Sequence, residues 1–153
     1  MKVSQKGLDL IKKFEGLQYY PYRCPAGKLT IGYGHVIDGK YEKTLIITSP
    51  IFEEEAERML KNDTKIAETI INNSVKTPLT QGKFDALVSL VYNWGGYYFR
   101  ASKGLQKLNA KDYDGAAKEF FDAEKGVVRA NGKVLCGLVN RRQAELRLWN
   151  VKA

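Results

Sequence analysis

The sequence predicts an α+β fold, in which a small antiparallel β lobe and a larger helical lobe are joined by a long helix. Residues 17–47 contain many β-type residues and alternating glycines, and the Asp38-Gly39 pair is a typical hairpin turn. At Ser49 the hydrophobic pattern changes to a helical period, which continues through most of the remaining chain. Because 153 residues suffice for one domain with a buried core, we expect a single domain over residues 1–153.

A short helix should precede the β lobe. Helical spacing places one apolar face on residues 4–14, and Ser4 is suited to the N-cap position. This face consists of Val3, Gly7, Leu10, Ile11 and Phe14. We expect the helix to end near Glu15 and Gly16 and to pack on the helical lobe, whereas the β lobe should cover about residues 15–60.

A long helix should begin at Ser49 and run to about Asn73. Ser49 is a good N-cap and Pro50 fits the first helical position. The three glutamates of residues 53–55 suit the first turn, because negative charge is favourable at a helix N-terminus. The expected apolar face consists of Phe52, Ala56, Met59, Ile66 and Ile70.

The helical lobe should cover about residues 75–153. Thr80 is predicted to cap a helix that ends at Gly95-Gly96. Its expected core residues are Phe84, Leu87, Val88 and Val91. Residues 105–124 predict two shorter helices with a break near residues 109–112. The last predicted helix covers residues 137–149, with apolar anchors at Leu138, Ala144, Leu148 and Trp149.

Composition narrows the possible function classes. The formal net charge of +8 suits an anionic partner, but does not distinguish nucleic acid, membrane and anionic polymer. One histidine and two distant cysteines cannot assemble a usual zinc site, and no phosphate-loop or calcium-loop pattern is present, so we expect no metal and no cofactor. No apolar run approaches the roughly 18 residues of a membrane span. The amphipathic N-terminus does not resemble a Sec-type signal, so we expect synthesis in a cytoplasm.

Glu15 is the strongest candidate for a catalytic group. It follows Phe14 at the end of the first predicted helix, and three tyrosines come soon after it. An apolar, aromatic setting suits a carboxyl group that must stay protonated near neutral pH as a general acid. Cys24 and His35 could instead form a thiol–imidazole pair, as in cysteine peptidases. Activated cysteines usually lie at helix N-termini, whereas the residues after Cys24 indicate a turn.

The residues that follow Glu15 form a recognisable pattern. Glu15 is followed after eight residues by Cys24, after five more by Thr30, and then by Ile31-Gly-Tyr-Gly-His35. This resembles the phage-type lysozymes, or endolysins, whose signature is Glu-x8-Asp/Cys-x5-Thr entering a Gly-x-Gly-His strand. Three later segments, residues 80–95, 105–120 and 137–149, resemble that family's helices in the same order. The resemblance therefore covers nearly the whole chain and implies a lysozyme-like fold.

The resemblance implies a catalytic set and a reaction. The reaction is hydrolysis of the β-1,4 bond between N-acetylmuramic acid and N-acetylglucosamine in peptidoglycan. Glu15 would protonate the leaving oxygen, Cys24 would place or activate a water, and Thr30 would help hold it. Position 24 is cysteine rather than the commoner aspartate, and a thiol with an ordinary pKa of about 8.5 is a poorer base unless its thiolate is stabilised. The sequence leaves open whether Cys24 acts as a base, as a nucleophile or only as a water-positioning group. It therefore also leaves open whether the configuration at the anomeric carbon is inverted or retained.

Further residues are predicted to contact the substrate. They are Tyr33, His35, Val36, Tyr92, Asn93 and Arg141. His35 has a structural alternative, because the resemblance places Asp63 of the long helix opposite it as an ion-pair partner. Tyr92 and Asn93, with the adjacent tryptophan, could form a wall for stacking sugars or could cap the helical core. Arg141 and the arginine after it would bring a cation near Glu15, or would form a charged helix face.

The resemblance also implies partners and a location. A phage endolysin is made in the host cytoplasm, passes the membrane with the help of a holin, and lyses the cell by attacking peptidoglycan glycan strands in the periplasm. We expect a monomer that binds no nucleic acid. Three alternatives remain: a lytic transglycosylase that gives 1,6-anhydro products, a peptidoglycan peptidase that uses Cys24 and His35, and a non-enzymatic module that binds an anionic polymer. A disulfide between Cys24 and Cys136 is a further hypothesis.

Overall fold

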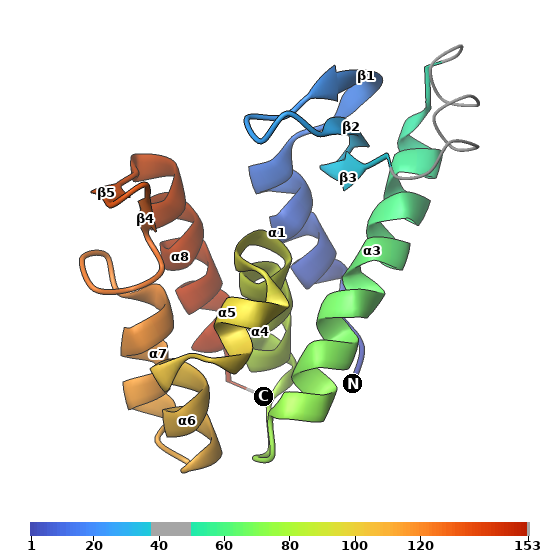
Figure 1. Ribbon diagram of the computed structural model, residues 1–153. Helices are drawn as coiled ribbons and strands as arrows, with labels where there is room; N and C mark the ends of the chain where they lie inside the picture. Colours follow the sequence, from blue (N-terminus) through green and yellow to red (C-terminus); the bar gives the residue numbers. More distant parts are fainter. Residues whose placement is uncertain (38–49, 153) are drawn as a thin grey trace. The chain divides into compact units, whose positions relative to one another are not determined.

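The computed structural model describes residues 1–37 and 50–152, and it confirms the predicted α+β fold. Two compact units are present (Figure 1). The β unit consists of Ile11–Thr64, and the helical unit consists of Met1–Leu10 and Lys65–Ala153. The predicted Asp38-Gly39 turn and the predicted N-cap at Ser49 lie outside the described residues.

The β unit contains one small antiparallel sheet, as predicted. Its strands are β1 (Gln18–Arg23), β2 (Leu29–Gly32) and β3 (His35–Val36), in the order β1-β2-β3. Tyr22 pairs with Thr30, and Ile31 pairs with His35. In and around this sheet the buried apolar residues are Ile31, Tyr33, Ile37 and Ile51, and the helical segments of the same unit also bury Ile11, Ala56 and Leu60. These buried residues explain why so short a sheet is stable, since isolated hairpins are marginal in water.

The first helix, α1 (Gln5–Glu15), has the predicted start and end. The backbone N–H of Gly7 donates to the Ser4 hydroxyl at 3.4 Å, as expected of an N-cap. Gly16 has φ 71° and its N–H donates to the Lys12 carbonyl, which ends the helix directly after Glu15. The helix buries Gly7, Leu8 and Ile11, whereas the predicted face had Leu10 in place of Leu8.

The long helix, α3 (Glu53–Ser74), corrects two predictions. It begins at Glu53, so Pro50 precedes the helix and does not occupy its first position; the three glutamates do lie in the first turn. Two predicted core residues are exposed, Phe52 at 70% and Ile66 at 67%. Ala56 is buried as predicted, and the other buried positions are Leu60, Thr64, Ala67 and Ile71. Both sets follow the helical period, but from Leu60 onward the buried positions lie one residue later than the predicted ones, so the buried face is rotated about the helix axis.

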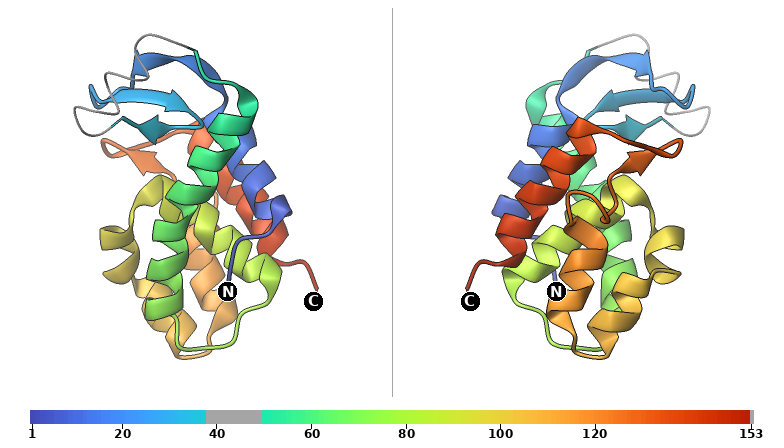
Figure 2. Two further views of the ribbon diagram at one scale, coloured as in Figure 1. Left: turned by 90° about the vertical axis from the view of Figure 1, so that its right-hand side faces the viewer. Right: turned by 90° about the vertical axis from the view of Figure 1, so that its left-hand side faces the viewer.

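The helical unit contains five helices after α3 among the described residues. They are α4 (Gln81–Trp94), α5 (Gly96–Arg100), α6 (Lys103–Asn109), α7 (Tyr113–Phe121) and α8 (Cys136–Trp149). Thr80 caps α4 by accepting from the Lys83 N–H at 3.2 Å, and Gly95, with φ 100°, ends it. The predicted break between α6 and α7 is also confirmed. α4 packs against α8, and α6 against α7 (Figure 2).

Aromatic side chains form much of the core of the helical unit. Phe120 contacts Phe99 with ring centroids 5.7 Å apart, and Phe121 contacts Trp149 at 5.5 Å. The four predicted core residues of α4 are all buried. Between α7 and α8 lies a hairpin that was not expected from the sequence, with strands β4 (Arg129–Ala130) and β5 (Lys133–Val134).

Candidate functional site

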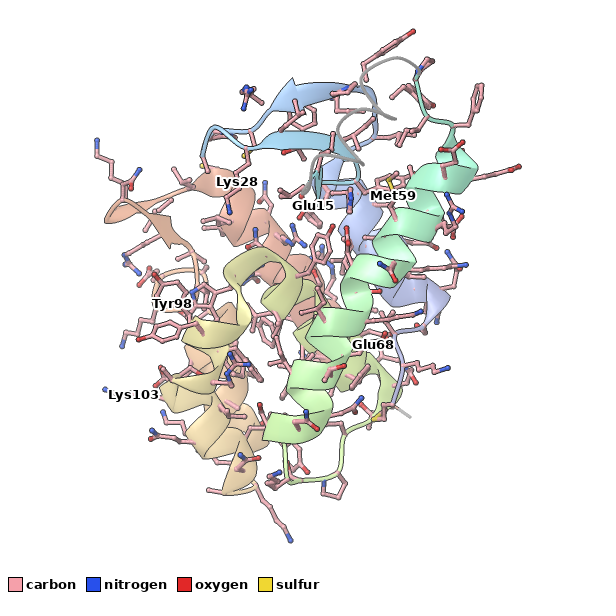
Figure 3. All side chains as sticks on the ribbon, turned by 45° about the vertical axis from the view of Figure 1, so that its right-hand side comes forward. Glu15, Lys28, Met59, Glu68, Tyr98 and Lys103 are labelled. Carbon is pink, nitrogen blue, oxygen red and sulfur yellow. The ribbon has the colours of Figure 1, made fainter. Side chains whose placement is uncertain are left out.

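Glu15 is the last residue of α1, and its side chain is half-buried (Figure 3). Three residues later the chain enters β1, so the helix end and the start of the sheet are closely connected. The pKa of Tyr22 in β1 is raised by burial and, to a smaller extent, by the nearby Glu15 carboxyl. Glu15 therefore belongs to the same compact unit as the sheet.

Cys24 lies in a tight turn between β1 and β2. The Cys24 N–H donates to the Lys28 carbonyl at 3.0 Å, and the Gly27 N–H donates to the Cys24 carbonyl at 2.8 Å. The pKa of the Cys24 thiol is lowered from its ordinary value, chiefly by the backbone N–H of Lys28. Hydrogen bonds from the turn backbone and from Thr30 act in the same direction, and desolvation opposes them. The turn thus stabilises a thiolate, the condition under which cysteine becomes a useful base.

Thr30 is buried in β2, with 3% of its surface exposed. Its hydroxyl donates to the Lys28 carbonyl at 2.9 Å, and it also interacts with the Cys24 thiol. A threonine hydroxyl has one proton, so it can donate to the carbonyl or to the thiolate but not to both at once. Glu15, Cys24 and Thr30, the three predicted catalytic residues, are therefore all members of the β unit.

Three predicted substrate-binding residues are also in the β unit. Tyr33 is only 6% exposed, Lys12 Nζ lies 5.5 Å from its ring centroid, and burial raises the pKa of its phenol. His35 Nδ1 lies 2.7 Å from Asp63 Oδ2, which confirms the predicted ion pair. Val36, at 40% exposed, is the most accessible of the three. Substrate binding by these residues stays a prediction, and the burial of Tyr33 leaves it little surface to offer.

The other predicted substrate-binding residues belong to the helical unit. Tyr92 and Asn93 are in the last turn of α4, and Asn93 is exposed. Its side-chain oxygen accepts a hydrogen bond from Arg142 Nη2 at 3.0 Å. Arg141 is 4% exposed, and its guanidinium donates to the Ser89 carbonyl at 3.3 Å. Arg141 and Arg142 of α8 therefore each donate a hydrogen bond to α4.

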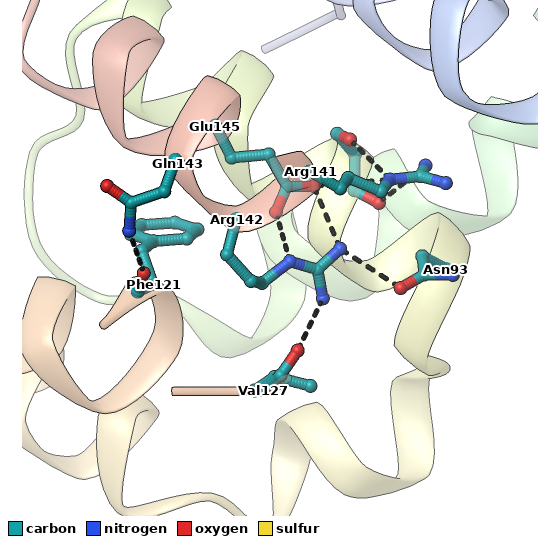
Figure 4. Close-up of polar contacts among 8 residues, drawn as sticks. Asn93, Phe121, Val127, Arg141, Arg142, Gln143 and Glu145 are labelled. Carbon is teal, nitrogen blue, oxygen red and sulfur yellow. Dashed lines mark hydrogen bonds and ion pairs between the residues drawn. The ribbon is translucent and has the colours of Figure 1, made fainter. Parts of the chain in front are cut away.

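A buried charged cluster on α8 corrects the prediction of a charged helix face (Figure 4). Arg142 and Glu145 are both fully buried, and Arg142 Nε lies 2.6 Å from Glu145 Oε1. Arg141 Nε lies 3.6 Å from the other Glu145 oxygen. Burial raises the pKa of Glu145, although the two guanidinium groups work to lower it. Glu145 was missed because a lone glutamate on a helix normally faces solvent, and no local signal marks it as buried.

A pocket of about 340 Å³ lies within the helical unit. Trp94 and Phe120 line its apolar part, and Lys103, Lys125 and Arg129 are its cationic residues. Tyr98 stacks on Trp94 with ring centroids 6.0 Å apart and is exposed at the surface of α5 (Figure 3). Trp94 was expected near a binding site, but the three cationic residues were not, because they come from α6, the loop after α7 and β4, which are separate segments of the chain.

The described residues contain no group of three or more His, Cys, Asp or Glu side chains arranged to hold a metal ion. Within the same residues, no helix is both long enough and apolar enough to cross a membrane. The two cysteines are free, with Cys24 half-buried and Cys136 exposed.

The chain thus combines a short sheet, a turn that carries Cys24, a glutamate at the end of α1 and a set of helices, which fits a lysozyme-type enzyme. The chain belongs to the phage lysozyme family, whose sequence pattern matches residues 12–145. It is 43% identical over 149 residues to an endolysin of Acyrthosiphon pisum secondary endosymbiont phage 1, covering 97% of this chain and 98% of that protein.

Two further similarities agree with this assignment. An endolysin of Bacillus phage PZA is 42% identical over 152 residues, but the match covers 98% of this chain and only 55% of that protein. The chain thus spans about half the length of that relative. The solved muramidase domain of SpmX from Asticaccaulis excentricus superposes with a TM-score of 0.84 at 35% identity, covering 99% of both chains. The expected family, lysozyme-like fold and lysozyme enzyme class are therefore confirmed.

Proposed function

We propose that this lysozyme hydrolyses the β-1,4 bond between N-acetylmuramic acid and N-acetylglucosamine in peptidoglycan. The observation that carries the proposal is the Cys24 turn, in which backbone N–H groups and Thr30 lower the pKa of the thiol. A thiolate at this position supplies the base that the family's commoner aspartate would supply, and Glu15 supplies the acid. Two ionisable groups on opposite sides of a glycosidic bond are the usual requirement for its hydrolysis.

The proposed reaction has one proton donor and one proton acceptor. Glu15 gives its proton to the glycosidic oxygen, and the bond from that oxygen to the anomeric carbon breaks with its electron pair on the oxygen. A water held by Thr30 bonds to the anomeric carbon and gives a proton to the Cys24 thiolate. The net reaction adds one water across the glycosidic bond. Afterwards Glu15 takes a proton from solvent and the Cys24 thiol loses its proton to solvent. Direct attack by water inverts the anomeric configuration.

A lytic transglycosylase is the second candidate, because Cys24 replaces the usual carboxylate. In that reaction Glu15 alone serves as acid and base, and a hydroxyl of the muramic acid residue attacks its own anomeric carbon. The product is then a 1,6-anhydro sugar, and no water is consumed. The two reactions therefore differ by the mass of one water in the released muropeptides.

The deciding experiment is mass spectrometry of purified peptidoglycan after digestion by the wild type and by Glu15→Gln. Glu124→Gln is a matched control, because Glu124 is exposed and belongs to the helical unit. Reducing-end muropeptides that are absent only with Glu15→Gln are the expected result. Anhydro-muropeptides would establish the transglycosylase instead, and cleaved stem peptides would indicate the Cys24/His35 peptidase. If the wild type leaves the glycan and the stem peptides intact, only the non-enzymatic module that binds an anionic polymer would remain as a function.

We also propose that the enzyme reaches the periplasm through a holin and acts there as a monomer. The net charge of +8 would favour its encounter with the anionic cell wall. Expression in a bacterium should cause lysis only when the inner membrane is opened by a holin or by chloroform. Lysis without either treatment would contradict the holin requirement. Light scattering of the purified protein should give the mass of a single 17.3 kDa chain.

A further inference from the structure

Two adjacent tyrosines are exposed on α5 of the helical unit. Tyr97 is 75% exposed and Tyr98 is 58% exposed, whereas the next residue, Phe99, is fully buried and packs on Phe120. Tyr98 stacks on Trp94 with an angle of 16° between the rings, and Tyr97 meets Tyr98 edge to face at 5.5 Å. These ring contacts hold Trp94, Tyr97 and Tyr98 together as one surface, which is named the aromatic platform.

The pocket of the helical unit shares Trp94 with the aromatic platform. Its three cationic residues come from α6 (Lys103), from the loop after α7 (Lys125) and from β4 (Arg129). None of these three side chains has a hydrogen-bond or ion-pair partner among the described residues. Tyr98 and Lys103 project from the same side of the helical unit (Figure 3). The platform therefore borders a pocket whose cations are available to a ligand.

One carboxylate, that of Glu119, also lines the pocket. It already has a partner, because Lys107 Nζ lies 2.9 Å from its Oε1. This hydrogen bond is the main cause that lowers the pKa of Glu119, and the charges of Lys103 and Lys125 lower it further. Three unpaired cations therefore outnumber one paired carboxylate, so the pocket attracts an anion.

The walls of the pocket are fixed by the core behind them. Phe120 is 1% exposed and Val128 is fully buried. A Cβ at Gly104 would overlap the Phe120 ring, so α6 and α7 are in close contact at this wall. Arg142 Nη1 donates to the Val127 carbonyl at 3.4 Å, which holds the loop that forms another wall. A site that is ordered before binding loses less conformational entropy when its ligand binds.

We propose that the aromatic platform and the pocket beside it bind a glycan strand of peptidoglycan, with sugar rings on the tyrosines and stem-peptide carboxylates on the three cations. This inference rests on the proposed function, since it takes peptidoglycan as the polymer that is bound. The C–H groups of a pyranose ring pack against an aromatic face, and a tyrosine hydroxyl bonds to the sugar hydroxyls. The N-acetylated sugars of the strand are uncharged, so its anionic groups are the carboxylates of the stem peptides, which ammonium and guanidinium groups bind well.

Two other anionic partners fit these residues less well. Single-stranded nucleic acid also combines stacking on aromatic rings with basic groups, but this chain belongs to a family of lysozymes. A membrane surface takes up the apolar face of a helix, whereas the apolar ring of α5, Phe99, is buried in the core. The exposed rings of α5 both carry a hydroxyl, which suits a sugar better than an acyl chain.

The test measures sedimentation with purified peptidoglycan sacculi in a Glu15→Gln background, so that the proposed cleavage does not remove the polymer. Adding Tyr98→Ala should weaken binding by about tenfold, the size of one lost aromatic contact. Tyr98→Trp keeps a ring for stacking, so its binding should stay within about twofold. On chitin, an uncharged polymer of N-acetylglucosamine, Tyr98→Ala should again weaken binding.

The cations are tested by the double variant Lys103→Gln/Lys125→Gln. It should weaken binding to sacculi by about tenfold at low salt and by less at high salt, because salt screens exposed charges. Its binding to chitin should not change. Lys6→Gln/Lys65→Gln is the matched control, since both of these lysines are exposed elsewhere on the helical unit. The control should bind sacculi within about twofold of the parent protein.

Unchanged binding to sacculi in Tyr98→Ala or in Lys103→Gln/Lys125→Gln would overturn the proposal. An equal loss in the control pair would also overturn it, because the effect would then depend on net charge alone. Tighter binding to single-stranded oligothymidylate or to phosphatidylglycerol vesicles than to sacculi would assign the platform to nucleic acid or to a membrane instead. Failure of the wild type to release reducing ends would overturn the proposed function, and it is distinguishable because binding by Glu15→Gln does not depend on cleavage.

Discussion

Arg142 Nε lies 2.6 Å from Glu145 Oε1, and neither side chain has any exposed surface. The two atoms are close but lack hydrogen-bond alignment, so this contact is an ion pair; Arg142 Nη2 supplies the hydrogen bond, donating to the other Glu145 oxygen at 3.2 Å. A second cation, Arg141, also faces Glu145. One carboxylate therefore compensates two buried guanidinium groups in the helical unit.

Replacing the carboxylate should be costly. Glu145→Gln leaves both guanidinium groups buried without a counter-charge, so we expect the free energy of unfolding to fall by about 3–5 kcal/mol. Urea titration followed by circular dichroism measures this. Glu124→Gln, at an exposed position, should change it by less than about 0.5 kcal/mol.

The contributions of Arg142 and Glu145 to the free energy of unfolding should also be coupled. The double variant Arg142→Met/Glu145→Met removes both members of this pair and leaves only Arg141 without its counter-charge, so it should be less destabilised than the sum of the two single variants. Additive losses would show that the pair does not stabilise the buried charges as the distances indicate.

The ion pair between His35 and Asp63 should stabilise the β unit. Their side chains are 17% and 23% exposed and 2.7 Å apart, so the interaction is only partly screened by water. Asp63→Asn should lower the free energy of unfolding by roughly 1–3 kcal/mol. Asp114→Asn, at an exposed carboxylate in the first turn of α7, serves as the control for loss of one negative charge. Equal stability of the two variants would argue against this role.

The Cys24 thiol should react at lower pH than an ordinary cysteine. Hydrogen bonds to the thiolate favour the charged form, so its pKa is lowered and more thiolate is present at neutral pH. In a Cys136→Ser background, the pH at which iodoacetamide alkylation reaches half its maximal rate should be lower than the corresponding pH for a free cysteine thiol. Enzyme activity should fall on the acid side as the thiolate becomes protonated.

Thr30 should contribute to that effect. Thr30→Val removes one hydrogen bond to the thiolate, so the alkylation profile should move to higher pH, although the Lys28 N–H still lowers the pKa. An unshifted profile in Thr30→Val would mean that the hydroxyl donates only to the Lys28 carbonyl.

The close contact between α6 and α7 should make Gly104 intolerant of a side chain. A Cβ at Gly104 would overlap the Phe120 ring, which is itself fully buried. Gly104→Ala should therefore lower the melting temperature, because overpacking costs about 1–3 kcal/mol and outweighs the roughly 1 kcal/mol that alanine contributes to a helix. Gly137→Ala is the matched control, since a Cβ there meets nothing within 4 Å, and it should raise the melting temperature. Similar shifts in both variants would contradict the packing argument.

Local signals predicted most of the secondary structure. Thr80 caps α4 and Gly95 ends it, because both interactions join residues within four positions of each other. The hairpin β4–β5 was missed although its Asn131-Gly132 turn is a typical hairpin signal. Its strands have only two residues each, too few for an alternating pattern to appear.

The sequence by itself determined the family and the catalytic candidates, since the spacing of Glu15, Cys24 and Thr30 can be read along one short segment. Only the tertiary structure decided how strongly the Cys24 thiol is acidified, because that depends on where the backbone N–H groups of the turn point. It also decided that Arg142 and Glu145 are buried, since Asn93 and Val127, the partners of Arg142, are 49 and 15 residues away. Burial is a property of contacts between distant segments, and a local pattern of charged residues does not carry it.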